Sequence, residues 1–174
     1  MSRRGGHLLF WLVLAGGLAA DLLSKHFVFR SLSNLRETTQ GSELNVWPGV
    51  FRLTMRMNPG GPFSLFSGHT WWLVGVSLVA LGVILYLYLS IMRRGETHGV
   101  FSLALIGAGA LGNLVDRLRF EGHVRDFIEL TFMDYPVFNV ADVLITLGVA
   151  LLVIELLRHD MSRAKREPAD VRKA

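Results

Sequence analysis

Two stretches of the chain are apolar and uncharged over about the length that crosses a bilayer. Residues 71–92 and 99–115 contain no Asp, Glu, Lys or Arg, and each approaches or reaches the roughly 20 residues that span about 30 Å of hydrocarbon. Two further apolar stretches, 8–29 and 140–157, contain ionisable groups near one end. The pattern therefore predicts four transmembrane helices, two of which carry polar groups at membrane depth.

The first loop, about residues 31–69, is long enough that a structureless segment would be unusual. Within it, residues 51–57 alternate strictly between apolar and polar, which is the period of a strand with one buried face. Residues 58–62 break this strand, and 63–66 are apolar again. We expect a small extracytoplasmic β-sheet in this first outer loop.

The second outer loop, residues 116–136, places apolar side chains among acids, and this spacing suits a short amphipathic segment at the membrane interface. The charged tail, residues 158–174, is assigned no chemistry. The predicted fold is thus an all-α polytopic membrane protein, one integral domain over residues 1–174, with four transmembrane helices and a small sheet.

Composition supports a membrane protein, since 51% of the residues are hydrophobic and the mean hydropathy is +0.41. The absence of cysteine excludes a thiol nucleophile, a disulfide framework and a thiolate metal site. The basic residues lie beside the spans and in the tail, which favours anionic lipid headgroups over nucleic acid as a partner.

The short loops and ends predict an orientation. Arg3 and Arg4 precede the first span, Arg93 and Arg94 lie between the second and third, and six Lys or Arg follow the fourth. The positive-inside rule then places both termini in the cytoplasm. A cleaved signal peptide at residues 8–20 is a weaker interpretation, because three more spans follow and an odd number would remain.

Ionisable residues at membrane depth are costly and are therefore candidates for function. In the first span, Asp21, Ser24 and Lys25 are spaced so that Asp21 faces both of the others on one side of a helix. A Ser-Lys protease dyad is disfavoured, since adjacent helical residues point about 100° apart. The plainer interpretation is an Asp21–Lys25 pair that ends the helix at the interface.

The third span ends with the same spacing, in Asn113, Asp116 and Arg117. These residues could be a solvated helix terminus, although Asn113 still lies inside the apolar run. Small residues precede them at 107–112 and would let a neighbouring helix approach closely.

Two further aspartates follow. Asp126 lies in the second outer loop and Asp142 at the outer end of the fourth span. Since this loop is short, the two carboxylates could converge, in which case repulsion raises one pKa so that one group acts as a base while the other donates a proton. The motifs H-E-x-x-H, G-x-S-x-G and G-x-G-D are absent, and the scattered histidines make a metal site improbable.

Five short motifs occur in an order and spacing that resemble the lipoprotein signal peptidase family. They are Asp21-x-x-Ser24-Lys25, Asn58-x-Gly60-x-x-Phe63-Ser64, Gly112-Asn113-x-x-Asp116-Arg117, Gly122-x-Val124-x-Asp126-Phe127 and Phe138-Asn139-x-Ala141-Asp142. The resemblance covers about Asp21 to Leu157. It departs from the family at Pro59-Gly60-Gly61-Pro62, where a second proline changes the expected shape of the loop.

The resemblance implies a membrane aspartic endopeptidase of the bacterial inner membrane that removes signal peptides from diacylglyceryl-modified prolipoproteins, cleaving before the lipidated cysteine without a cofactor or metal. It implies catalysis by Asp126 and Asp142 near the outer leaflet. The substrate-binding or site-supporting positions are Asp21, Lys25, Asn58, Gly60, Asn113, Asp116, Arg117 and Asn139. Of these, Asp116 with Arg117 is expected to brace the structure.

Two alternatives use the same charges without cleavage: a small proton-coupled carrier, and a bundle that binds lipoproteins but does not cut them. Polar groups at the outer ends of the spans disfavour a carrier, which needs a site at the midplane. The presence of both aspartates disfavours an inactive bundle. The sequence leaves open which aspartate is protonated, which lipoproteins are processed and the oligomeric state, which is compatible with a monomer.

Overall fold

A computed structural model describes residues 2–38, 43–60, 70–94 and 99–164 of the chain, and within these ranges the side chains of all residues except 37, 38, 70 and 159–164. Its elements are the helices α1 (Arg3–Thr38), α2 (Thr70–Arg93), α3 (Val100–Arg119) and α4 (Val140–Ala164), and the strands β1 (Leu44–Trp47), β2 (Phe51–Asn58) and β3 (Val124–Leu130). Within the described ranges, four helices are long and apolar enough to cross a membrane.

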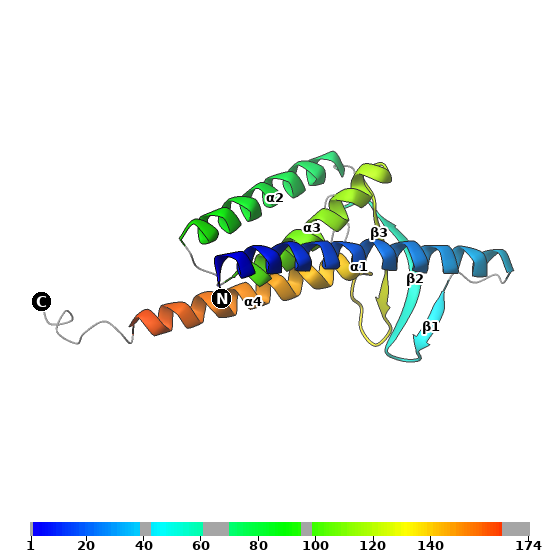
Figure 1. Cartoon of the computed structure of the whole chain (residues 1–174). Helices are drawn as coiled ribbons and strands as arrows, with labels where there is room; N and C mark the ends of the chain where they lie inside the picture. Colours follow the sequence, from blue (N-terminus) through cyan, green and yellow to red (C-terminus); the bar gives the residue numbers. More distant parts are fainter. Residues whose placement is uncertain (1, 39–42, 61–69, 95–98, 165–174) are drawn as a thin grey trace, which may run out of the picture.

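Helix α3 is the centre of the bundle. It packs against α1, α2 and α4, and 72% of its most apolar 18-residue window is buried, compared with 17% or less for the other three helices. In Figure 1 the helices lie roughly side by side, and the first turn of α1 and the last turns of α4 are found at the same end, opposite the sheet. The outer surfaces of α1, α2 and α4 are thus left to face lipid.

The bundle core lies toward the end opposite the sheet. Phe10 of α1 stacks on Tyr88 of α2 with ring centroids 3.8 Å apart, and Met92, Val100 and Leu103 close the same cluster. His7 hydrogen-bonds to the hydroxyl of Tyr88. These contacts join α1 and α2 at that end of the bundle.

Helix α1 extends nine residues past the predicted limit of about residue 29 and ends at Thr38. Its 36 residues give a rod of roughly 54 Å, much longer than the hydrocarbon layer. The prediction that Asp21 and Lys25 end this helix is therefore wrong. The extension has a packing partner, because Leu32 is 1% exposed and α1 contacts β2 and β3.

The sheet was predicted within the first loop only, yet it has three antiparallel strands in the order β1-β2-β3, and β3 comes from the second loop. The amphipathic interfacial segment expected there is instead this strand, whose Phe127 is 3% exposed. The predicted strand at 51–57 is confirmed, but not its single buried face. Its register is irregular between Leu53 and Arg56, and Thr54 is its most buried residue.

Helix α3 ends at Arg119 rather than near residue 115. The charges of Asp116 and Arg117 do not end the helix, because both side chains are buried. Phe63, Ser64 and the second proline at Pro62 lie outside the described residues, as does the end of the charged tail.

Candidate active site

Asp126 is held by two asparagine side chains. The Nδ2 group of Asn58 donates to Asp126 Oδ2 at 2.8 Å, and that of Asn139 donates to Oδ1 at 2.6 Å. Asn58 is the last residue of β2, and Asn139 lies just before α4. A carboxyl group 2% exposed is thus fixed from two directions by neutral donors.

Asp142 lies in the first turn of α4 and is also held by N–H donors. Its Oδ1 accepts from Asn113 Nδ2 at 2.9 Å, and its Oδ2 accepts from the backbone N–H of Asn139 at 3.1 Å. The backbone N–H of Asp142 in turn donates to Asn139 Oδ1 at 3.1 Å, a reciprocal arrangement that starts the helix. Asp142 is partly exposed, so water can reach it.

Asn139 is the residue that joins the two aspartates. Its side chain donates to Asp126, while its backbone N–H and side-chain oxygen bond Asp142. Asn113 lies beside it, since Asn139 Nδ2 is 3.2 Å from Asn113 Oδ1. The convergence that the short second loop only made feasible is therefore found in the structure.

The amide of Asn113 has a fixed orientation. Its Oδ1 accepts a hydrogen bond from Lys25 Nζ at 3.0 Å, and an ammonium can only donate. The NH₂ group of Asn113 must then face Asp142. Lys25 therefore orients the donor that reaches Asp142, although it does not touch that aspartate itself.

Beside these aspartates lies a cluster of buried charges, which we call the paired cluster: Asp21, Lys25, Asp116 and Arg125. Lys25 Nζ lies 2.8 Å from Asp21 Oδ2 and 3.4 Å from Asp116 Oδ2. Arg125 NH2 lies 2.7 Å from Asp116 Oδ1. Two acids meet two bases, so the cluster is neutral.

The paired cluster also clamps the helices together. Asp21 Oδ1 accepts the backbone N–H of Ala141, in the first turn of α4, at 2.9 Å. A Cβ atom on Gly112 would collide with the Asp21 carboxylate, and one on Gly109 would collide with the Ala141 carbonyl. The small residues predicted to allow close helix packing do so here, and they bring α1 and α4 onto α3 at the level of the aspartates.

Burial raises the pKa of Asp126 to about 7. The hydrogen bonds from Asn58 and Asn139 act in the opposite direction, and the nearby charge of Asp142 raises the pKa further. Asp126 lies in β3, outside the four spans. A carboxyl group with this pKa can hold a proton near neutral pH and release it.

The structure brings together nearly all residues singled out in the sequence. Gly60 is buried and its N–H donates to Asn58 Oδ1 at 3.0 Å, which sets the direction of that amide. Ser24 Oγ donates to the Asp21 carbonyl at 2.9 Å and so is not poised as a nucleophile.

Asp116 and Arg117 were expected to brace the structure together, but the ion pairs of Asp116 among the described residues are with Lys25 and Arg125. Arg117 as a residue is 9% exposed, and its buried Nε has no hydrogen-bond partner among the described residues. The closer partner of Asp116 is Arg125, for which the sequence predicts no role. The signal that could have indicated this role is the alternation of side chains along β3. It places Arg125 on the face of the strand opposite to Asp126.

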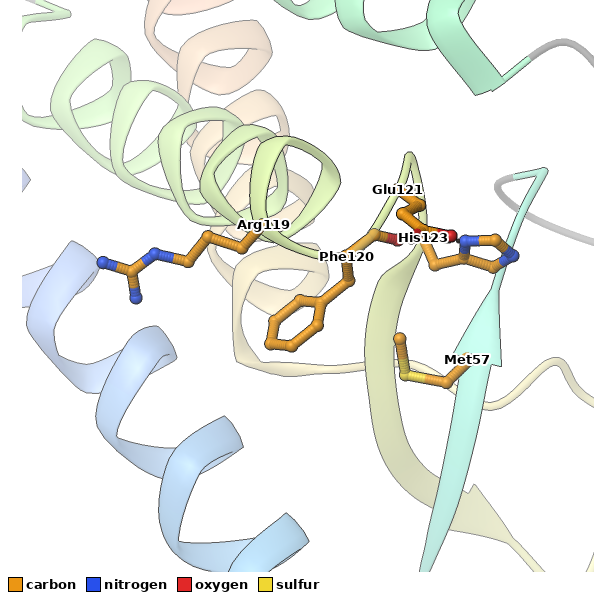
Figure 2. Close-up of a pocket in the computed structure, with 5 residues that line it drawn as sticks. All are labelled: Met57, Arg119, Phe120, Glu121 and His123. Carbon is orange, nitrogen blue, oxygen red and sulfur yellow. Dashed lines mark hydrogen bonds between the residues drawn. The ribbon is translucent and has the colours of Figure 1, made fainter.

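An open pocket of about 360 Å³ lies where the turn between α3 and β3 meets the end of β2 (Figure 2). Met57, Arg119, Phe120, Glu121 and His123 line it. None of the ten candidate site residues is among them, so this hollow is not the place where the aspartates would meet a substrate. Phe120, between the pocket and the paired cluster, lies 4.7 Å from the Arg125 guanidinium carbon.

Comparison with known proteins places this geometry in a family. A family model described as "Signal peptidase (SPase) II" matches residues 13–158. The lipoprotein signal peptidase of Gloeothece citriformis is 42% identical over 147 residues, covering 83% of this chain and 86% of that protein. That of Gloeobacter violaceus is 39% identical over 166 residues, covering 95% of this chain and 88% of that protein.

A solved structure described as a bacterial membrane enzyme is similar to this fold, with a TM-score of 0.75 and 27% sequence identity. The alignment covers 92% of this chain and 93% of that one. Sequence and fold thus agree over nearly the whole described molecule, including the segments that carry the two aspartates. The chain belongs to the signal peptidase II family.

Proposed function

We propose that this membrane protease removes the signal peptides of diacylglyceryl-modified prolipoproteins, cleaving before the lipidated cysteine by direct attack of water between Asp126 and Asp142. Membership of the family supports the substrate class. The observation that carries the chemistry is the position of Asn139, which bonds both carboxyl groups at once. Two aspartates held by one residue, Asp126 by its side-chain amide and Asp142 by its backbone N–H, are arranged as an acid and a base.

The proton is assigned to Asp126. Burial raises its pKa to about 7, so the protonated form can donate to the oxygen of the scissile carbonyl. Asp142 is partly exposed and is held in place by two N–H donors, so it is assigned as the base that deprotonates the attacking water. Water adds to the carbonyl carbon as Asp142 takes one of its protons and the proton of Asp126 passes to the carbonyl oxygen, which gives a gem-diol. Asp142 then passes its proton to the leaving nitrogen, the C–N bond breaks and Asp126 takes back a hydroxyl proton. No covalent enzyme intermediate forms.

The surrounding polar residues hold this pair and the substrate. Lys25 orients Asn113, Asp21 fixes the start of α4, and Gly60 orients Asn58. Arg117 is assigned to the substrate, because a buried guanidinium whose Nε lacks a partner needs an acceptor such as a peptide carbonyl. Asp116 is assigned a structural role through its bonds to Arg125.

The protein is placed in the bacterial inner membrane with both termini in the cytoplasm. Arg3, Arg4, Arg93 and Arg94 lie at helix ends opposite the sheet, as the positive-inside rule requires. The aspartates then lie at the outer leaflet, where a diacylglyceryl cysteine keeps its acyl chains in lipid.

The test is to replace Asp126 or Asp142 by Asn and to follow cleavage of a diacylglyceryl prolipoprotein by gel shift in proteoliposomes. Each change is expected to lower kcat by at least about a thousandfold, because either the base or the proton donor is lost. Asp134→Asn is the matched control, since Asp134 is exposed in the loop after β3. Full processing by either dyad variant would refute the mechanism.

A further inference from the structure

The register of the sheet separates apolar from polar side chains. Residues paired across neighbouring strands share a face, so the pairings define three rows. They are Leu44-Leu53-Ile128, Asn45-Arg52-Glu129 and Trp47-Phe51-Leu130. The first and third rows are apolar and the middle row is polar. Because successive rows point to opposite faces, one face carries six apolar side chains, and we call it the apolar face.

The polar row on the opposite face, Asn45-Arg52-Glu129, meets water. Arg52 of β2 lies 2.7 Å from Glu43, the residue before β1, and 2.8 Å from Glu129 of β3, so one cation pairs with both acids. These side chains are 20–43% exposed. The Arg52 bonds also hold the pKa of Glu129 below its ordinary value, as expected for an ionised pair that stays hydrated.

Much of the apolar face remains exposed. Leu44 is 46% exposed and Trp47 is 62% exposed, while the four other members are half-buried. The loop after β3 adds Phe132, which is 63% exposed. The loop after β3 lies next to the turn between β1 and β2, because the Thr131 N–H donates to the Val50 carbonyl in that turn at 2.9 Å.

This exposed surface lies at the outer end of the bundle. In Figure 1 the β1–β2 turn and the loop after β3 hang together to one side, beside the outer ends of the helices, while α1 runs well past them. Alternation along β3 also places Asp126 on the same face as Ile128 and Leu130. The apolar face is thus continuous with the site.

We propose that the apolar face, with Trp47 and Phe132 at its tip, rests on the lipid of the outer leaflet and holds Asp126 at the depth of a lipid-anchored scissile bond. The inference depends on the orientation given under the proposed function. The sheet is joined to the ends of the spans and cannot leave the interface, so lipid is always within reach of this face. Aromatic side chains favour that depth, whereas a protein partner would call for a polar rim around its contact.

The natural chain has no cysteine, so single cysteines can be placed at will. Trp47→Cys and Phe132→Cys, spin-labelled in vesicles of phosphatidylethanolamine and phosphatidylglycerol, are expected to collide several-fold more with oxygen than with a water-soluble nickel chelate. Asn45→Cys is the control on the polar row, and the nickel chelate should dominate there. Tyr86→Cys on α2, which is 70% exposed, marks the value for lipid.

Two outcomes overturn the proposal. Labels at Trp47 and Phe132 that match Asn45 would mean that the face meets water, and labels shielded from both reagents would mean that protein covers it. This readout does not depend on cleavage. An active Asp126→Asn variant would therefore refute the mechanism while leaving the labelling result intact.

A kinetic measurement adds the functional consequence. The double variant Trp47→Ser with Phe132→Ser is expected to raise KM for a prolipoprotein in vesicles about three- to tenfold, with kcat within twofold of the natural enzyme. Cleavage of a short peptide substrate in detergent should not change. An unchanged KM in vesicles, or an equal loss on the detergent substrate, would contradict the positioning role.

Discussion

Asp116 and Asp126 are both buried at the end of the bundle that carries the sheet, yet their partners belong to different chemical classes. Asp116 bonds Arg125 and lies beside Lys25, so its charge is cancelled by cations. Asp126 bonds only the amides of Asn58 and Asn139 among the described residues. Asp116 is buried against cations and serves structure through its ion pairs, whereas Asp126, whose pKa burial raises to about 7, can exchange a proton.

The two groups are nevertheless linked. Lys25 belongs to the paired cluster but also orients Asn113, whose amide reaches Asp142. Asp21 similarly bonds the backbone of Ala141, next to Asp142. The neutral cluster therefore holds Asp126 and Asp142 in position. The free energy that its charges lose by leaving water is offset because each charge is paired.

Replacing Lys25 by Met breaks the paired cluster and should give the largest loss of stability. Asp21 and Asp116 would be left buried with Arg125 as the one cation, a change that typically costs about 3–5 kcal/mol. The midpoint of thermal unfolding in detergent should fall by roughly 10 °C. Arg30→Met, an exposed position on the same helix, is the control and should change little.

A double variant sharpens this test. Adding Asp21→Asn to Lys25→Met removes one uncompensated charge, while Asp116 keeps Arg125. Part of the lost stability should return. If the double variant is instead less stable than the single one, charge pairing is not what holds the cluster.

Replacing Asn139 by Ala tests the hydrogen bonds that hold Asp126 and Asp142. The backbone donor to Asp142 remains, but the side-chain bonds to Asp126 and from Asp142 are lost. We expect kcat/KM to fall about a hundredfold with a small change in unfolding midpoint. Asn58→Ala, which removes one bond to Asp126 alone, should cost about tenfold. Equal losses of kcat/KM in Asn139→Ala and Asn58→Ala would contradict a special role for Asn139.

The pKa of Asp126, about 7, predicts a pH dependence. If its protonated form is the active one, kcat/KM should fall about tenfold per pH unit above pH 7. The hydrogen bond from Asn58 lowers the pKa of Asp126. Its removal in Asn58→Ala should therefore raise that pKa and move the alkaline fall in kcat/KM to higher pH. Glu129→Gln, on the polar face of the sheet, should leave it in place. A limb that does not move in Asn58→Ala would assign it to another group.

The same pKa has a consequence for stability. The unfolded chain loses the Asp126 proton near pH 4, whereas the folded protein keeps it to about pH 7. The folded state thus binds more protons in this window, and its stability should decrease as pH rises from 4 to 7. In Asp126→Asn this contribution disappears, which thermal unfolding across the window would detect.

Hydropathy predicted the parts of the fold that face lipid. Helices α2 and α4 begin and end within a few residues of the predicted limits apart from the extension of α4 to Ala164. Lipid contact depends on composition alone, so a window average detects it. Hydropathy did not predict the part of α1 after residue 29, because its burial comes from contacts with β2 and β3. A window average contains no information on such a packing partner.

The site shows the same division. The i, i+4 spacing gave the Asp21–Lys25 pair, since helix geometry fixes it locally. Arg125 was missed as the partner of Asp116 because the chain reverses between them, through Glu121 and Gly122 with positive φ angles of 51° and 87°. Such a reversal depends on tertiary packing. Asp126 was found only through motif order, as no local property distinguishes a buried loop aspartate from an exposed one.

Arg52→Gln should give the smallest effect and marks the limit of the comparison. Arg52 makes two ion pairs, as Lys25 does, but the side chains in its pairs remain hydrated. Because these groups lose little hydration on folding, the ion pairs add little to the free energy of unfolding. We expect the unfolding midpoint to move by less than about 2 °C, and less still in high salt, with kcat unchanged. A drop as large as that of Lys25→Met would show that the number of ion pairs matters more than their burial, and the contrast between the two cations would fail.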